Sequence, residues 1–195
     1  MNYEAKNFER LLGTEGFSDV LLRNHFTLYE GYVSNTNKLS EILKSTEVGT
    51  PAYNEIKRRF GWEWDGMRLH ELYFGNMAKG GKLLEEKSLL GKRMEEDFGS
   101  IEAWEKDFRA TGALRGIGWA MLVSDNETGS IFNVWVNEHD TGHLAGASIL
   151  LVMDVFEHAF ATDYGIKRAD YISAFWKAID WEVVADRFAP TPIRS

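Results

Sequence analysis

The chain has 195 residues, enough for one large domain or two small ones, and 44% of them are hydrophobic, which excludes a disordered chain. It contains no cysteine, so disulfide scaffolds, thiolate nucleophiles, iron–sulfur clusters and zinc sites with cysteine ligands are excluded. The formal charge of −8 argues against binding to nucleic acid. The N-terminal stretch lacks the apolar core of a signal peptide, and no run is apolar enough to span a membrane. We therefore expect a soluble cytoplasmic protein with neither nucleic acid nor membrane as a partner.

The first eighty residues predict helices. Residues 6–12 indicate a short helical turn, and Ser18 is a candidate N-cap for a long helix over 18–44, where apolar residues recur at helical spacing. Residues 47–51 contain Gly and Pro and end that pattern, and a second long helix follows over 52–77. Two long helices joined by a short turn predict an antiparallel helical hairpin.

The rest of the chain predicts a second domain of the α+β class, an α/β domain with a three-stranded antiparallel sheet. A glycine pair at 80 and 81 is the predicted linker, so the expected domains are 1–80 and 81–195. The expected elements are helices over 84–97 and 101–114, strands over 119–123, 130–136 and 148–153, and helices over 155–163, 168–178 and 181–188, after which Pro190 and Pro192 end the ordered part.

Four polar side chains stand out against these apolar elements. Asp154 and His158 are four residues apart, and on a helix they would share a face, either chelating one metal ion or forming a structural hydrogen bond. His25 and His70 lie among apolar residues of the two long helices, where either one alone is typical of a core position. Together, three imidazoles and a carboxylate on inward-facing positions form a ligand set suited to iron, manganese or zinc.

Seven short motifs, each unspecific alone, follow one another in an order that is specific. They are Asn24-His25, then YVSNTN at 32–37, LHELYF at 69–74, FGS at 98–100, GIGW at 116–119, DVFEHA at 154–159 and YISAFW at 171–176. In this order and at these separations, the chain resembles the iron/manganese superoxide dismutase family along nearly its whole length.

The resemblance implies one iron or manganese ion per subunit, bound between two domains by His25, His70, Asp154 and His158, with a solvent molecule as the fifth ligand. In this family the metal cycles between the +3 and +2 states while superoxide becomes dioxygen and hydrogen peroxide. The ligands are the same for both metals, so the sequence does not choose between iron and manganese.

The resemblance also implies roles for two residues beside the metal. Tyr32 matches a tyrosine at the substrate channel. Many iron enzymes of the family have a glutamine four residues before the second histidine ligand, where this chain has Gly66. Manganese enzymes have glycine there and supply a glutamine from the loop after the second strand, where His139 stands in this chain. We therefore expect His139 to bond the solvent ligand and tune the redox potential.

Further matches predict the surroundings of the site. Glu157 matches a glutamate that bonds a metal-bound histidine across a two-fold axis, which implies a homodimer, with dimers and tetramers both left open. Trp119 is retained from the family's aromatic shell, and Phe74 and Phe156 stand where tryptophan is usual. Arg168 is a candidate for the locally positive approach that an anionic substrate needs in an acidic protein.

The chain departs from the family near the expected channel. His25 and Tyr32 are seven residues apart where eight are usual, which predicts a local bulge or a shifted ligand. Residues 28–30 (LYE) replace a pair of histidines, and Ala161 replaces a tyrosine that contacts one of them across the dimer. These departures leave a non-catalytic or redox-divergent dimeric member of the same fold as one alternative to a dismutase. A mononuclear non-haem iron oxygenase is a second, because imidazoles and a carboxylate with an open position resemble the site of such enzymes. His143 matches nothing in the family and is expected to be structural or on the surface.

Overall fold

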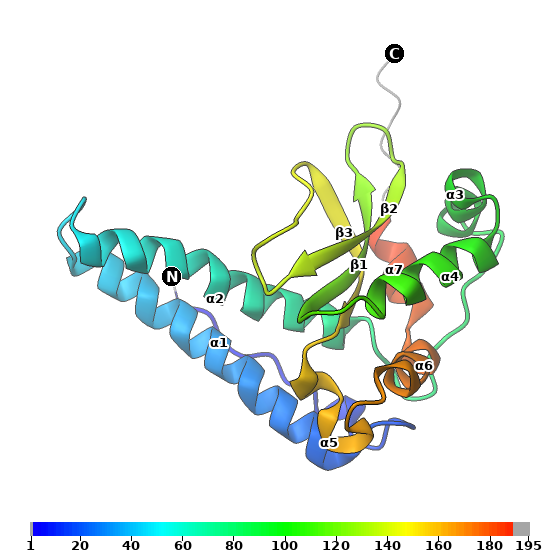
Figure 1. Cartoon of the computed structure of the whole chain (residues 1–195), viewed down its shortest axis with the longest axis horizontal. Helices are drawn as coiled ribbons and strands as arrows, with labels where there is room; N and C mark the ends of the chain where they lie inside the picture. Colours follow the sequence, from blue (N-terminus) through cyan, green and yellow to red (C-terminus); the bar gives the residue numbers. More distant parts are fainter. Residues whose placement is uncertain (1, 189–195) are drawn as a thin grey trace.

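The computed structural model describes residues 2–188 (Figure 1), so the predicted end of order at Pro190 and Pro192 lies outside the described residues. Its N-terminal part is the expected helical hairpin, formed by α1 (Asp19–Ser45) and α2 (Pro51–Gly75). The Ser18 side chain accepts a hydrogen bond from the main-chain N–H of Leu21, as the predicted cap requires. Thr50 caps α2 in the same way, and Pro51 occupies its first turn, where a missing N–H costs nothing.

Two arginines hold the inner end of α2. Arg10, in the short 3-10 helix η1 (Glu9–Leu11), donates to the carbonyls of Phe74 and Met77 at 2.8 and 2.6 Å. Arg187 donates to the carbonyl of Leu72 at 3.0 Å. Cations at a helix C-terminus satisfy its unpaired carbonyls and complement the helix dipole. The segment that carries His70 is therefore anchored by both ends of the described chain.

The C-terminal part contains the expected three-stranded sheet of β1 (Gly118–Asp125), β2 (Ile131–Asn137) and β3 (Ala147–Asp154), with β1 in the centre and both neighbours antiparallel to it. The helices of this part are α3 (Leu89–Phe98), α4 (Ile101–Gly112), η2 (Glu157–Ala159), α5 (Ala161–Tyr164), α6 (Arg168–Ala178) and α7 (Trp181–Arg187). Helix α4 packs on β1 and β2, whereas α2 and α7 pack on β3 (Figure 1). The mixed α+β class is confirmed.

The prediction of one helix over 155–163 is wrong. The 3-10 turn η2 and the four-residue α5 replace it, separated by Phe160 at φ −146°, which is not a helical conformation. The chain turns at this point because Asp154 Oδ1 accepts the main-chain N–H of Phe156 at 2.9 Å, a local bond that competes with helix formation. The helix expected from residue 84 begins at Leu89, because Ser88 is its cap.

The inner end of the hairpin and the sheet enclose a common core. Tyr73 on α2 stacks on Phe175 on α6, with ring centroids 5.6 Å apart, and residues 150–153 of β3 are fully buried. The division at Gly80 and Gly81 stays a prediction. In the described part of the chain, no helix combines the length and the apolar character needed to cross a membrane.

Candidate metal centre

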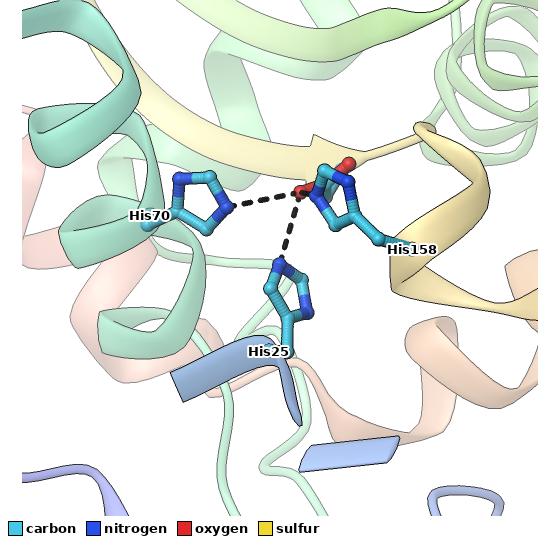
Figure 2. Close-up of side chains that lie close together, drawn as sticks. His25, His70 and His158 are labelled. Carbon is cyan, nitrogen blue, oxygen red and sulfur yellow. Dashed lines mark hydrogen bonds and ion pairs between the residues drawn. The ribbon is translucent and has the colours of Figure 1, made fainter. Parts of the chain in front are cut away.

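Four side chains from four separate elements meet where the hairpin touches the sheet. His25 comes from α1, His70 from α2, Asp154 from the end of β3 and His158 from η2. In Figure 2 the three imidazoles point toward one carboxylate oxygen. The Nε2 atoms of His25, His70 and His158 lie 3.2, 3.6 and 3.1 Å from Asp154 Oδ2. One ligand atom from each residue lies within 4.8 Å of all the others, so the group is compact enough for a single ion.

The convergence of Asp154 and His158 does not come from a shared helix face. Asp154 is the last residue of β3, and the turn closed by its bond to the Phe156 N–H brings His158 back over it. The tyrosine Tyr171 also donates its hydroxyl to the Asp154 carbonyl. The sequence spacing of four was therefore informative, but the structure that uses it is a strand end followed by a 3-10 turn.

The protonation of the cluster fits a cation. His70 Nδ1 donates to the Gly66 carbonyl at 2.6 Å, so its Nε2 presents a lone pair to the centre. That buried Nε2 has no hydrogen-bond partner among the described residues. Burial lowers the pKa of His25 and of His70 below the usual value of a histidine. Neutral imidazoles with an unsatisfied lone pair are the nitrogen ligands that iron, manganese and zinc bind.

Asp154 supplies the negative charge of the cluster. Burial raises the pKa of its carboxyl, but the charge of His158 and hydrogen bonds from His158 and His25 outweigh burial and hold that pKa well below its usual range. The carboxyl is fully buried, and an ionised buried carboxylate needs cationic or hydrogen-bonding partners. The residues present therefore fit a bound metal cation.

His139 and Tyr32 form a hydrogen-bonded pair beside the cluster. The Trp119 indole N–H donates to His139 Nδ1 at 3.1 Å, which assigns the ring proton to Nε2. That Nε2–H donates to the Tyr32 hydroxyl at 2.9 Å. Burial lowers the pKa of His139 to about 4 and raises the pKa of Tyr32 above its usual value, so both groups are neutral near pH 7. The Tyr32 ring also stacks on His70, with centroids 5.1 Å apart.

The expected bulge between His25 and Tyr32 is absent, because α1 is continuous from Asp19 to Ser45. Seven residues make close to two turns at about 3.6 residues per turn, so both side chains face the site. Gly66 provides the space for Tyr32: a Cβ at this position would lie 2.6 Å from the tyrosine ring. The glycine thus accommodates the ring that His139 bonds.

The three predicted aromatic side chains surround the histidines. Trp119 and Phe74 are fully buried, and Phe156 is half-buried. Such rings exclude water from the centre and strengthen its electrostatic interactions. The ring centroids lie 4.9 Å apart for Phe74 and His25, 5.0 Å for Trp119 and His70, 5.0 Å for Phe156 and His158, and 4.9 Å for Phe156 and His139.

Glu157 and Arg168 lie outside this centre. Glu157 is exposed, although it precedes His158 directly. Arg168 donates to the carbonyls of Leu114 and Gly116 at 2.6 and 2.8 Å. The side chains of Glu157 and Arg168 both line a surface cavity of about 400 Å³. Their predicted roles in dimer contact and substrate approach stay predictions.

Two further residues define the surroundings. Tyr29, one of the departures from the family pattern, is fully buried; its hydroxyl accepts from the Lys6 N–H and donates to Glu71. It therefore fastens the N-terminal segment to the hairpin. Trp62 was not predicted as a site residue, yet its ring centroid lies 4.4 Å from that of His139. Its only sequence signal is its place four residues before Gly66 on the same helix.

Comparisons with known proteins agree with this geometry. The model of the iron/manganese superoxide dismutases, C-terminal domain, matches residues 86–187. The chain is 38% identical over 174 residues to superoxide dismutase [Mn] 2 of Haloferax volcanii, covering 87% of this chain and 85% of that protein. It is 37% identical over 183 residues to superoxide dismutase [Fe] of Aquifex aeolicus (89% and 85%). It is 35% identical over 180 residues to superoxide dismutase [Fe] of Cupriavidus metallidurans (89% and 89%). Relatives named for either metal therefore match at similar identity.

Proposed function

The chain belongs to the iron/manganese superoxide dismutase family, and we propose that it converts two superoxide anions and two protons into one dioxygen and one hydrogen peroxide. The observation that carries this proposal is the compact set of three imidazoles and one carboxylate, with an unpartnered His70 Nε2 facing its centre. We infer that His25, His70, Asp154 and His158 hold one iron or manganese ion per subunit. When bound, that ion supplies a one-electron couple between its +3 and +2 states.

The protein side chains set the charge and the ligand geometry of this site. Asp154 contributes one negative charge, and burial favours the neutral form of His25 and of His70 by lowering their pKa. The Gly66 carbonyl fixes the His70 tautomer by accepting its Nδ1–H. Bonds of this kind orient a ligand and adjust its basicity.

Tyr32 and His139 are the proposed catalytic residues, because the formation of peroxide requires protons near the buried centre. Trp119 holds the His139 proton on Nε2, and this proton is donated to the Tyr32 oxygen. The Tyr32 hydroxyl proton then points to another acceptor, and burial keeps that hydroxyl protonated. The tyrosine can thus donate its proton to the reacting oxygen species, while the His139 N–H stabilises the tyrosine oxygen left behind until a solvent proton replaces the one that was donated.

We propose a homodimer, with two dimers pairing into a tetramer as a further outcome to be measured. Leu114 and Ile166 are 49% and 99% exposed at the cavity that Glu157 and Arg168 line. A two-fold axis there would let Glu157 bond His158 of the partner subunit. Light scattering coupled to size exclusion measures the oligomer, and an Ile166→Glu variant should be monomeric. Location in the cytoplasm stays a prediction, which cell fractionation tests.

The test of function is a joint measurement of metal and activity. Purified protein should contain iron or manganese in a one-to-one ratio by elemental analysis. It should also suppress the reduction of cytochrome c by a superoxide source, whereas the same preparation after heat denaturation should not. Stoichiometric metal without dismutation would favour the non-catalytic member of the fold. Consumption of dioxygen with an organic substrate would favour the oxygenase.

A further inference from the structure

The loop that carries His139 is fastened to α2 through Trp62. The Trp62 indole N–H donates to Glu138 Oε2 at 3.0 Å. The Arg59 guanidinium lies over the indole ring, 3.7 Å from its centroid, and the His139 ring meets the indole in an edge-on contact with centroids 4.4 Å apart. The Tyr32 ring also lies against Trp62, with centroids 5.6 Å apart. Of these four contacts, two involve the residues at the start of the loop.

Glu138 has a backbone conformation that needs support. Among residues 2–188 it is the only non-glycine with a positive φ, at 51°. A side chain with a Cβ is unfavourable in this left-handed region, so the conformation persists where surrounding contacts hold it. Glu138 directly precedes His139, and its conformation therefore sets the direction in which the His139 side chain leaves the main chain.

A second contact fastens the other side of the loop. His143 Nε2–H donates to the His139 carbonyl at 2.8 Å and lies 3.8 Å from Asp65 Oδ2. Asp65 is one turn along α2 from Trp62, and Gly66, which makes room for Tyr32, follows it directly. One stretch of α2 therefore contacts the loop before His139, the loop after it, and the tyrosine that His139 bonds.

We propose that Trp62, acting through Glu138, and His143, acting through the His139 main chain, are positioning residues that hold the His139 imidazole on Tyr32. The proposal rests on the proposed function, because His139 is taken to serve the metal centre. The physical need is geometric: the His139 ring must meet Trp119 at 3.1 Å and Tyr32 at 2.9 Å at the same time. A displacement of about 1 Å in such an arrangement can cost about 100-fold in rate.

The first experiment compares two tryptophans of α2. Trp62→Phe keeps a ring against His139 but removes the N–H donor to Glu138. Trp64→Phe is the matched control, because Trp64 packs on Tyr3 and Phe60, away from the centre. In the metal-loaded enzyme, Trp62→Phe should lower kcat about 10-fold and shift the midpoint potential of the metal, with metal content unchanged. Trp64→Phe should leave all three values as in the wild type.

The second experiment tests whether the Glu138 side chain acts as the hydrogen-bond acceptor for Trp62. Glu138→Gln keeps an oxygen acceptor for Trp62 and should retain most of the rate. Glu138→Ala removes the acceptor and should match Trp62→Phe, and His143→Ala should give a smaller loss in the same direction. Wild-type values of kcat and midpoint potential in Trp62→Phe, Glu138→Ala and His143→Ala would overturn the proposal.

A structural readout keeps this test independent of the proposed function. Crystal structures of the wild type and Trp62→Phe, as purified, should show the hydrogen bond between His139 Nε2 and the Tyr32 hydroxyl intact in the first and lengthened or broken in the second. If the wild type fails to dismute superoxide but Trp62→Phe still breaks this bond, the proposed function fails and the positioning role stands. An intact bond in Trp62→Phe and in Glu138→Ala would refute the positioning role whatever the activity.

Discussion

The two ends of the helical hairpin share one secondary structure but have opposite surroundings. The inner half, residues 19–33 and 62–75, carries His25, Tyr32 and His70 and is covered by the sheet and by η2 and α5. The outer half, residues 34–61, leads to a tip that extends away from the rest of the molecule (Figure 1), and its base is held by two hydrogen bonds between Asn37 and the Tyr3 main chain. Its charged residues form exposed pairs such as Glu41 with Lys44. Local caps and spacing are therefore sufficient for the helices, whereas chemistry arises only where other elements cover them.

Two glycines of α2 express the same difference. At Gly66, in the inner half, a Cβ would lie 2.6 Å from the Tyr32 ring. At Gly61, in the outer half, a Cβ would meet nothing within 4 Å. Packing therefore requires glycine at Gly66, whereas at Gly61, five positions earlier in the same helix, glycine only weakens the helix.

The largest effect should come from the carboxylate that faces the inner half. Asp154→Ala should abolish tight metal binding and dismutation, because it removes the one negative charge among the four side chains. Asp154→Asn, which can keep the bond to the Phe156 N–H, should also lose the metal while remaining folded by circular dichroism. The exposed Asp170→Ala is the control and should retain metal. Elemental analysis decides, and an unchanged metal content in Asp154→Ala would refute the ligand assignment.

Filling the space at Gly66 should have the next largest effect. Gly66→Ala should destabilise the protein by about 1–3 kcal/mol, because the buried Tyr32 ring must move to admit a methyl group. The same movement lengthens the bond from His139 to Tyr32, so dismutation should fall as well. Denaturant titration and the cytochrome c assay measure the two effects. A stable, fully active variant would show that Tyr32 does not depend on this glycine.

The matched substitution in the outer half should have the opposite sign. Gly61→Ala should stabilise the protein by about 0.5–1 kcal/mol, since alanine restricts the unfolded chain and meets no neighbour. The melting temperature should rise by about 1–4 °C for a chain of this size, with activity unchanged. Loss of stability in Gly61→Ala would mean that the outer half is packed against something, such as a second pair of subunits.

The smallest effect is expected from the exposed ion pair at the hairpin tip. Lys44→Ala removes the pair with Glu41, in which both side chains are mostly in water. Exposed pairs are screened by solvent and salt. The melting temperature should therefore stay within about 1 °C of the wild type in thermal scans at low and at moderate salt. A clear drop that salt removes would assign this pair a structural role.

Most of the helices and all three strands followed from local pattern. Ser18 and Thr50 cap the hairpin helices, and the runs of apolar and β-favouring residues on either side of the turn at 125–129 form β1 and β2. The helix predicted over 155–163 was wrong, because the Asp154 side chain accepts a hydrogen bond from the Phe156 main-chain N–H and this bond competes with the helix. His25, His70, Asp154 and His158, predicted together as metal ligands, do meet in space, but Asp154 and His158 meet through a strand end and a 3-10 turn and not on a shared helix face.

The sequence by itself determined the helical hairpin, the small sheet, the acidic cysteine-free composition and the family pattern, because these depend on neighbours within a few turns or on ordered motifs. Only the tertiary structure decided what the side chains contact. His25 meets Asp154 across 129 positions, and His139 meets Tyr32 across 107. Contacts at such separations depend on how whole elements pack, and local propensity carries no information about that packing. Trp62 and Glu138 belong to this second class, and the packing of α2 against the loop at 137–143 brings them together.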